Sequence, residues 1–159
     1  MIETDRLTLR PLSRDDLPAV AAVLGDPEAT AGLHTPDPQT DPAVVAKILD
    51  RWVEQAEMYT LIVKATGETA GFVGFVPREM EWGDELELGW LLLKAHWGKG
   101  YATEAAKALR PLKEQRIISL IRTDNKASER VAAKIGSSKE RELTYYGHQT
   151  GVWVSPKAS

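Results

Sequence analysis

The stretch that decides the fold is LELGWLLLKAHWGKGYATEAAKAL, residues 86–109. Its first part, 86–93, alternates apolar and polar residues and then becomes continuously apolar, which predicts a strand whose second half is buried on both faces. Its last part carries alanine and leucine at helical spacing, which predicts a helix that begins at Tyr101. The linker between them, 94–100, contains Gly98 and Gly100. The stretch therefore predicts a strand, a glycine-rich loop and a helix in direct succession.

This loop is suited to bind an anion. The first turn of a helix leaves N–H groups unpaired, its dipole places partial positive charge there, and glycines let a phosphate approach the backbone. Lys99 adds a full charge. A plain strand-to-helix turn is the structural alternative, since such turns often use glycine.

Two known phosphate motifs do not fit this loop. A P-loop needs an earlier glycine and a hydroxyl residue after the lysine, and Gly98-Lys99-Gly100 has neither. In the dinucleotide fingerprint a third glycine would stand where this chain has Thr103. Only 59 residues follow Gly100, too few for the rest of a doubly wound sheet.

Outward from this stretch, further strand and helix patterns follow without repeats or long linkers. Pro11 ends the first strand, and Ser13 and Asp41 suit helix N-caps. In chain order we expect a strand before Pro11, helices at 14–24 and 42–53, a hairpin at 58–77, the strand and helix described above, a strand at 116–124, a helix at 125–135 and strands at 140–146 and 149–154. This order predicts an α+β fold with a mixed, mostly antiparallel sheet of about seven strands flanked by about four helices.

Composition narrows the function classes. The 159 residues suit one domain spanning 1–159, and the lack of cysteine excludes a disulfide scaffold, a thiolate metal site and a cysteine nucleophile. The three histidines, His34, His96 and His148, have no ligand spacing, so we expect no metal. No apolar run reaches the roughly 20 residues of a membrane span, and the first residues do not resemble a signal peptide. We therefore expect no membrane association and a cytoplasmic protein.

Charge is divided unevenly along the chain. Residues 1–93 hold 7 Lys+Arg and 17 Asp+Glu, whereas residues 94–141 hold 12 Lys+Arg and 5 Asp+Glu. Chance segregation on solvated faces is the plain interpretation. The alternative is a polyanionic ligand on the basic side and a cationic one on the acidic side. Because the chain is acidic overall, nucleic acid is not an expected partner, and a small polyanionic cofactor fits better.

Three separated motifs carry a resemblance to a known family: ELGWLL at 87–92, HWGKGYATEA at 96–105 and TDNKASERVAAKIG at 123–136. In this order they resemble the GNAT superfamily of acyl-CoA-dependent N-acetyltransferases. The opening TDRLTLRPLSRDDLPAV, residues 4–20, is similar to the branch that includes the ribosomal-protein N-terminal acetyltransferases. The resemblance covers nearly the whole chain and implies acetyl-CoA as cosubstrate and a GNAT-like sheet that splays at the cofactor site.

The resemblance also implies which residues hold the cosubstrate. The family's pyrophosphate-binding pattern falls on Trp97, Gly98, Lys99, Gly100, Tyr101 and Ala102, with Trp97 in place of the usual Gln or Arg. The pantetheine arm is expected along Trp90, Leu91 and Leu92, with a backbone N–H near Leu92 as oxyanion donor. Asn125 and Ser128 match the family's cofactor contacts near the sulfur, and Arg130 is expected to help with the phosphates.

Amine acetylation needs a neutral amine and a proton source for the leaving thiolate. An α-amine has a pKa of about 8, so a modest base or a water relay suffices. Glu87 is the candidate base, direct or through water, and an exposed structural carboxylate is the alternative. Ala132 stands where many relatives have a catalytic tyrosine. Ser128 is therefore the candidate proton donor, unless it only caps its helix, and Tyr145 and Tyr146 are weaker candidates.

Together these features predict an N-acetyltransferase that moves an acetyl group to a primary amine by direct attack in a ternary complex. The acceptor would be a protein N-terminus or a small cationic amine, bound between loops 32–40 and 145–151. A surface-loop role for His34 is preferred over an acceptor contact. A catalytically silent acyl-CoA-binding module is the alternative function, and a monomer and a homodimer both stay open. Two residues fit the pattern poorly: Pro111 should kink or end its helix, and Ser137 replaces an apolar residue.

Overall fold

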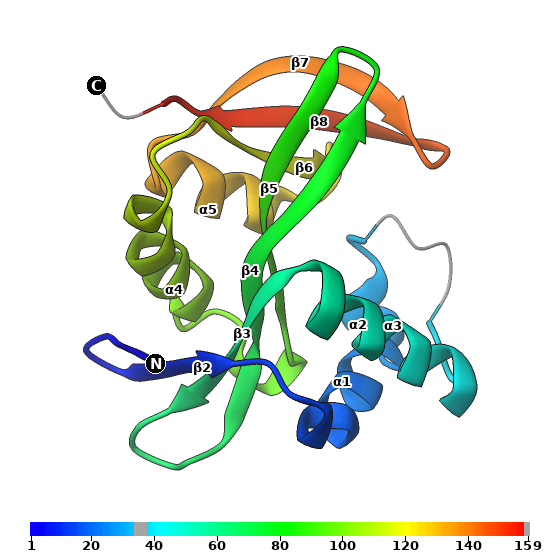
Figure 1. Cartoon of the computed structure of the whole chain (residues 1–159), viewed down its shortest axis with the longest axis vertical. Helices are drawn as coiled ribbons and strands as arrows, with labels where there is room; N and C mark the ends of the chain where they lie inside the picture. The colour runs from blue at the N-terminus through cyan, green and yellow to red at the C-terminus, as the bar shows by residue number, and fades with distance from the viewer. Residues whose placement is uncertain (34–37, 158–159) are drawn as a thin grey trace.

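The computed structural model describes residues 1–33 and 38–157 (Figure 1). These residues form one eight-stranded sheet with the order β1-β2-β3-β4-β5-β6-β8-β7. The strands are β1 (Ile2–Glu3), β2 (Leu7–Pro11), β3 (Glu57–Val63), β4 (Thr69–Met80), β5 (Gly83–Leu92), β6 (Ile117–Arg122), β7 (Ser138–Tyr145) and β8 (His148–Ser155). The α-helices are α1 (Leu17–Leu24), α2 (Pro27–Thr30), α3 (Pro42–Gln55), α4 (Tyr101–Leu109) and α5 (Lys126–Lys134).

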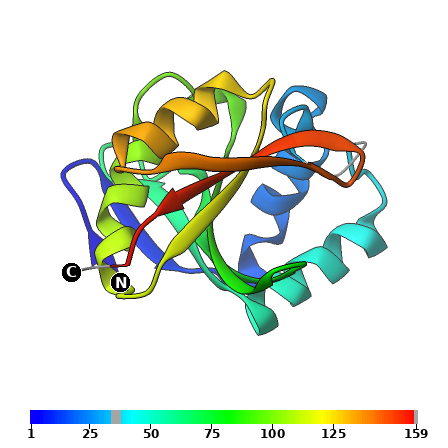
Figure 2. The ribbon, with the colours of Figure 1, turned by 90° about the horizontal axis from the view of Figure 1, so that it is seen from above.

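Helices cover both faces of the sheet. Figure 2 shows α4 and α5 on one side of the strands and α1 to α3 on the other. Leu88 of β5 is fully buried in the core cluster that contains Leu109 of α4. Leu91, an odd-numbered residue of the same strand, packs against a second buried cluster, which contains Leu49 of α3. Alternation along β5 thus sends even-numbered side chains toward α4 and odd-numbered ones toward α1 to α3.

The sheet opens between β5 and β6. All strand pairings among the described residues are antiparallel except this one, whose register contains the single pair Glu87 and Ile118. The Ser119 hydroxyl donates to the carbonyl oxygen of Leu88 at 2.7 Å, and no further backbone pair follows. Beyond this point the two strands diverge, so the predicted splay in a mixed, mostly antiparallel sheet is confirmed.

The described fold contains slightly more regular structure than the sequence predicted. The extra strand is β1, which pairs with β2, and the extra helix is the four-residue α2. The helix at the glycine loop ends as an α-helix at Leu109, and Arg110–Leu112 continues as a single 3-10 turn. Pro111 explains this early end, since its ring lacks the N–H that would extend the helix. Ser137 is buried, and its N–H donates to the carbonyl oxygen of Ala132.

Candidate active site

At the end of β5, backbone groups that no neighbouring strand pairs with face the gap in the sheet. Leu93 donates its N–H to the carbonyl oxygen of Ala70 at 2.9 Å, so this residue points toward β4. In an antiparallel pair the direction alternates from one residue to the next. The N–H and C=O groups of Trp90 and Leu92 therefore point the other way, toward β6 and the gap. This is the orientation expected for an oxyanion donor at Leu92.

The glycine loop closes back onto the same strand end. Trp97 donates its indole N–H to the carbonyl oxygen of Leu92 at 3.0 Å, while its ring stays partly exposed. The tryptophan that replaces the family's Gln or Arg therefore fastens the loop to β5. The carbonyl oxygen of Leu92, which faces the gap, is therefore already hydrogen-bonded.

The loop itself has the backbone that its glycines permit. Gly98 and Gly100 have φ of 74° and 80°, values that side-chain-bearing residues rarely adopt. Gly100 caps α4 without any side-chain hydrogen bond, and the first helical N–H to find a backbone acceptor is that of Glu104, which donates to the Gly100 carbonyl. The first N–H groups of α4 thus have no partner in the described chain, which is the condition for the anion binding that the sequence predicts.

A cavity of about 400 Å³ joins these features. Its lining residues from the loop and from α4 are Trp97, Gly98, Gly100, Tyr101, Ala102 and Thr103. Those from β5 and α5 are Trp90, Leu91, Leu92, Asn125, Ala127, Ser128, Arg130, Val131 and Lys134. The remaining ones, Glu28, Ala29, Gly32 and Leu33, come from α2 and the turn after it. Because α2 and α4 lie on opposite faces of the sheet, the cavity has walls from both faces (Figure 2).

Most of the predicted site residues meet in this cavity, and two do not. Lys99 and Glu87 are outside its lining. Helix α2, which also lines the cavity, was not predicted from the sequence. Asp26 and Pro27 carry the same N-cap and first-position proline as Asp41 and Pro42, so a signal for this helix was present.

A hydrogen-bonded bridge spans the gap beside Leu92. Trp90 of β5 donates its indole N–H to Ser128 Oγ at 3.1 Å, and Asn125 Oδ1 accepts the N–H of Ser128 at 3.2 Å. Asn125 is therefore the N-cap of α5. Within the described chain the Ser128 hydroxyl accepts a hydrogen bond but has no acceptor for its own proton. It is available as a donor, as a proton source for a thiolate must be.

The cations at the cavity are not neutralised by acidic neighbours. Arg130 and Lys134 both line it, and neither forms an ion pair or side-chain hydrogen bond with another described residue. In contrast, the cavity's acidic residue Glu28 is paired with Lys94 at 2.6 Å. The basic part of the sequence thus supplies unpaired positive charge along the wall that α5 contributes to the cavity.

Glu87 lies just behind the gap, on the face of the sheet that carries α2. It is 8% exposed, so its interpretation as an exposed strand carboxylate is wrong. Arg78 Nε donates to Oε1 at 2.9 Å, and the Leu120 N–H donates to Oε2 at 3.0 Å. Its carboxylate therefore takes the place of the backbone acceptor that Leu120 loses where β5 and β6 part.

Other groups gather on the same face. Tyr145 packs with Leu120 in a small apolar cluster, and burial raises the pKa of its phenol. Tyr146, in the turn after β7, is largely exposed and contacts the Tyr145 ring edge-on. Arg122 of β6 donates to the carbonyl oxygen of Leu33 at 3.2 Å. Gly32 and Leu33 of one expected acceptor loop line the cavity, and Tyr145 of the other packs with Leu120, whereas His34 lies outside the described residues.

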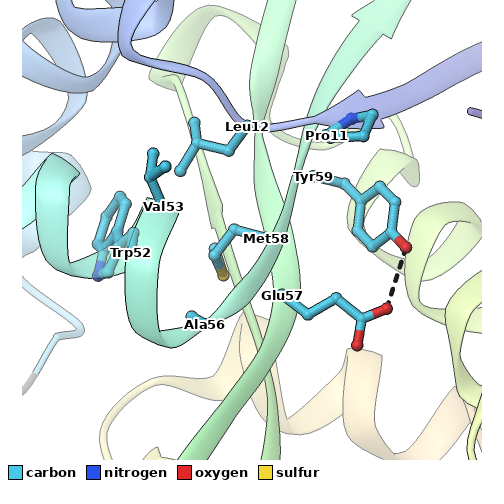
Figure 3. A pocket seen from close by; sticks show the side chains of 8 residues that line it. All are labelled: Pro11, Leu12, Trp52, Val53, Ala56, Glu57, Met58 and Tyr59. Carbon is cyan, nitrogen blue, oxygen red and sulfur yellow. Dashed lines mark hydrogen bonds between the residues drawn. The ribbon is translucent and has the colours of Figure 1, made fainter.

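A second hollow, of about 210 Å³, lies at the far edge of the sheet, where the end of α3 meets β2 and β3 (Figure 3). Its acidic residue, Glu57, accepts a hydrogen bond from Tyr59 and is neutralised by Lys113 at 2.7 Å. Among residues 1–33 and 38–157, no group of three or more His, Cys, Asp or Glu side chains could hold a metal ion. No helix in that part of the chain is long and apolar enough to cross a membrane.

Comparison with known proteins identifies the family. A family model described as an acetyltransferase (GNAT) domain matches residues 6–138. The uncharacterized N-acetyltransferase p20 of Bacillus licheniformis is 32% identical over 157 residues, which cover 93% of this chain and 88% of p20.

Two solved structures share the fold. RimL, the ribosomal L7/L12 α-N-protein acetyltransferase in complex with coenzyme A, has a TM-score of 0.77 at 21% identity, covering 97% of this chain and 96% of RimL. Spermidine N-acetyltransferase from Vibrio cholerae, in complex with CoA and spermine, has a TM-score of 0.78 at 14% identity, with 97% of both chains covered. The resemblance drawn from the three sequence motifs is confirmed: this chain belongs to the GNAT family of acetyltransferases.

Proposed function

We propose that this chain is an acetyl-CoA-dependent N-acetyltransferase, a single domain that transfers the acetyl group to a primary amine by direct attack in a ternary complex. The observation that carries the proposal is the cavity through the splayed sheet. Its walls come from α4 and α5 on one face and from α2 on the other. Two substrates can therefore reach the gap from opposite sides, as direct transfer between them requires.

The residues at the cavity fit acetyl-CoA. The free N–H groups at Gly98 to Ala102 would hold its pyrophosphate, and the unpaired Arg130 would add charge to its phosphate groups. The inward-facing backbone groups of Trp90 would pair with the amides of its pantetheine arm, which would run past Leu91 and Leu92. Asn125 and Ser128 would border its sulfur. Bound there, acetyl-CoA supplies the activated acyl group, and the protein supplies position and charge.

Three groups of the chain would assist the transfer. The N–H of Leu92, aimed into the gap, would donate to the thioester oxygen as negative charge grows on it. Glu87 would take the proton of the amine, most simply through a water, because it lies behind the cavity wall rather than in it. Each of its oxygens accepts one hydrogen bond and keeps one lone pair. Ser128 would return a proton to the thiolate.

The acceptor is a primary amine: a protein N-terminus or a small cationic amine. The acidic composition of residues 1–93 supports a cationic acceptor, since those residues supply α2 and β5. Of the two solved structures compared above, one is named for protein α-amines and the other for spermidine. Both kinds of acceptor therefore belong in the first assay.

Calorimetric titration with acetyl-CoA, followed by a thiol-release assay over peptides and polyamines, tests the proposal. We expect micromolar binding and release of CoA thiol with at least one amine. A protein that binds no acetyl-CoA at high micromolar concentration would refute it. Binding without turnover on any amine would favour the second candidate, a silent acyl-CoA-binding module, which the alanine at position 132 and the two hydrogen bonds already made by Glu87 support.

A further inference from the structure

The turn between β1 and β2 is fastened to the start of α4. Thr4 donates its hydroxyl to Glu104 Oε2 at 2.6 Å, and the Arg6 N–H donates to the same oxygen at 2.9 Å. Arg6 Nε donates to Glu104 Oε1 at 2.7 Å. Burial would raise the pKa of Glu104, but these hydrogen bonds outweigh burial and lower it. The carboxylate is therefore a charged anchor for the arginine beside the glycine loop.

Arg6 also holds the loop directly. Its Nη1 donates to the carbonyl oxygen of Lys99 at 2.7 Å, and its guanidinium lies 4.7 Å from the centre of the Tyr101 ring. Its Nη2 lies 3.4 Å from the point where a Cβ on Gly100 would stand. Two nitrogens of one side chain thus approach the Lys99–Gly100 peptide, and Arg6 is not among the residues that line the cavity.

The orientation of this peptide matters because its two ends point in opposite directions. The chain has no cis peptide among its described residues, and in a trans peptide the C=O and the following N–H are antiparallel. Because the Lys99 carbonyl points at Arg6, the Gly100 N–H points away from Arg6, and Gly100 lines the cavity whereas Arg6 and Lys99 do not. No described group accepts a hydrogen bond from it. Glycine reaches positive and negative φ about equally easily, so Gly100 does not itself prevent the peptide from turning over.

We infer that Arg6 is a positioning residue of the cosubstrate site: it fixes the Lys99–Gly100 peptide so that the Gly100 N–H points at the pyrophosphate. Glu104 and Thr4 hold Arg6 in place for this task. Without Arg6 the peptide could turn its carbonyl oxygen inward, where it would repel a phosphate. The inference rests on the proposed function, because it presumes a pyrophosphate-bearing substrate in this cavity.

The test is CoA binding by calorimetry to the wild-type protein and to Arg6→Met and Arg6→Ala. Met keeps the apolar stem over Tyr101 and removes every donor, whereas Ala removes both. We expect either variant to bind CoA roughly tenfold more weakly, since a charge-assisted hydrogen bond is lost. The KM for acetyl-CoA should rise by the same factor while kcat at saturation stays near the wild-type value. A merely structural role would lower the melting temperature without this separation.

Arg14→Met is the matched control. Arg14 is also an exposed arginine with carboxylate partners, Asp50 and Glu54, but it lies away from the cavity. We expect its CoA affinity to be unchanged. The inference is overturned if the folded Arg6 variants bind CoA within twofold of wild type, or if Arg14→Met is weakened as much. If the wild-type protein itself binds no CoA, it is the proposed function that fails.

A measurement on the wild-type protein covers the case in which neither Arg6 variant folds. Titration of ¹⁵N-labelled protein with inorganic pyrophosphate should move the amide proton of Gly100 downfield, as a new hydrogen bond to an anion does. The amide proton of Glu104, which already donates to the Gly100 carbonyl, should move less. A titration in which the other free amides of the loop respond and Gly100 does not would contradict the proposed orientation of the peptide.

Discussion

Two buried carboxylates, each paired with one arginine, lie in different parts of the molecule. Asp16, just before α1, accepts from both terminal nitrogens of Arg10 at 2.9 and 2.7 Å, from the Ser13 N–H at 3.0 Å and from the Thr60 hydroxyl at 2.9 Å. Glu87, at the gap in the sheet, accepts only from Arg78 Nε and from the N–H of Leu120. Both are nearly inaccessible, at 5% and 8% exposure.

The difference in the number of hydrogen bonds distinguishes a carboxylate with a structural role from one that can react. A carboxylate has about four positions for hydrogen-bond donors. At Asp16 four donors of the protein surround the carboxylate, three on Oδ2 and one on Oδ1, so the group joins β2, β3 and the start of α1. At Glu87 two positions stay open beside the gap. The same pairing of charges thus serves stability in one place and leaves room for proton transfer in the other.

Glu87→Gln should show the largest effect, on turnover. We expect kcat to fall about a hundredfold at neutral pH, the size typical of a lost general base, and the acid limb of the pH–rate profile to disappear. CoA affinity should stay unchanged, because Glu87 does not line the cavity. Steady-state kinetics over pH and calorimetry with CoA measure the two quantities.

The glutamine also distinguishes the two roles of Glu87. It keeps a carbonyl oxygen that can accept from the Leu120 N–H, so the place where β5 and β6 part is preserved. If Glu87 only satisfies this N–H, the variant will keep the wild-type rate and pH profile. That outcome would make Glu87 an anchor like Asp16.

The comparison also shows what the sequence could predict. The glycine loop was predictable because its unpaired groups are backbone N–H groups, and the local pattern Gly98-Lys99-Gly100 before a helix specifies them. Glu87 was found as a residue, but its partners were not. Arg78 and Leu120 are 9 and 33 positions away on neighbouring strands, and only the register of the sheet brings them together.

The missed and extra elements have a similar cause. A four-residue helix such as α2 is too short to show a 3.6-residue period, although its cap was visible at Asp26. The role proposed for Arg6 depends on a contact with Lys99, 93 positions away. Features set by residues close together in the sequence were therefore predictable. Contacts between residues on different strands were not.

Asp16→Asn should act on stability instead. We expect the free energy of unfolding to fall by about 2–3 kcal/mol, because the asparagine NH₂ group faces donors and the Arg10 charge loses its partner. At temperatures where the variant is folded, kcat should equal the wild-type value. Urea unfolding and steady-state kinetics test this. A variant as stable as wild type, or one slowed like Glu87→Gln, would remove the distinction between the two carboxylates.

The smallest expected effect is a pH dependence that belongs to Asp16. Burial by itself would raise the pKa of this carboxyl, but the hydrogen bonds from Arg10, Ser13 and Thr60 outweigh burial and lower it below its ordinary value of 3.8. A carboxyl whose pKa is lowered in the folded state contributes stability above its unfolded pKa. That contribution is lost as the pH falls through the folded value.

Between pH 7 and pH 3, the wild-type protein should therefore lose more stability than Asp16→Asn, by roughly 1 kcal/mol. Urea unfolding at several pH values measures the gap between the two proteins. The carboxyls of Glu85 and Glu104, whose pKa values are also lowered, titrate in both proteins and cancel in this difference. A gap that stays constant down to pH 3 would mean that Asp16 holds its place by shape and neutral hydrogen bonds, and that its charge contributes nothing.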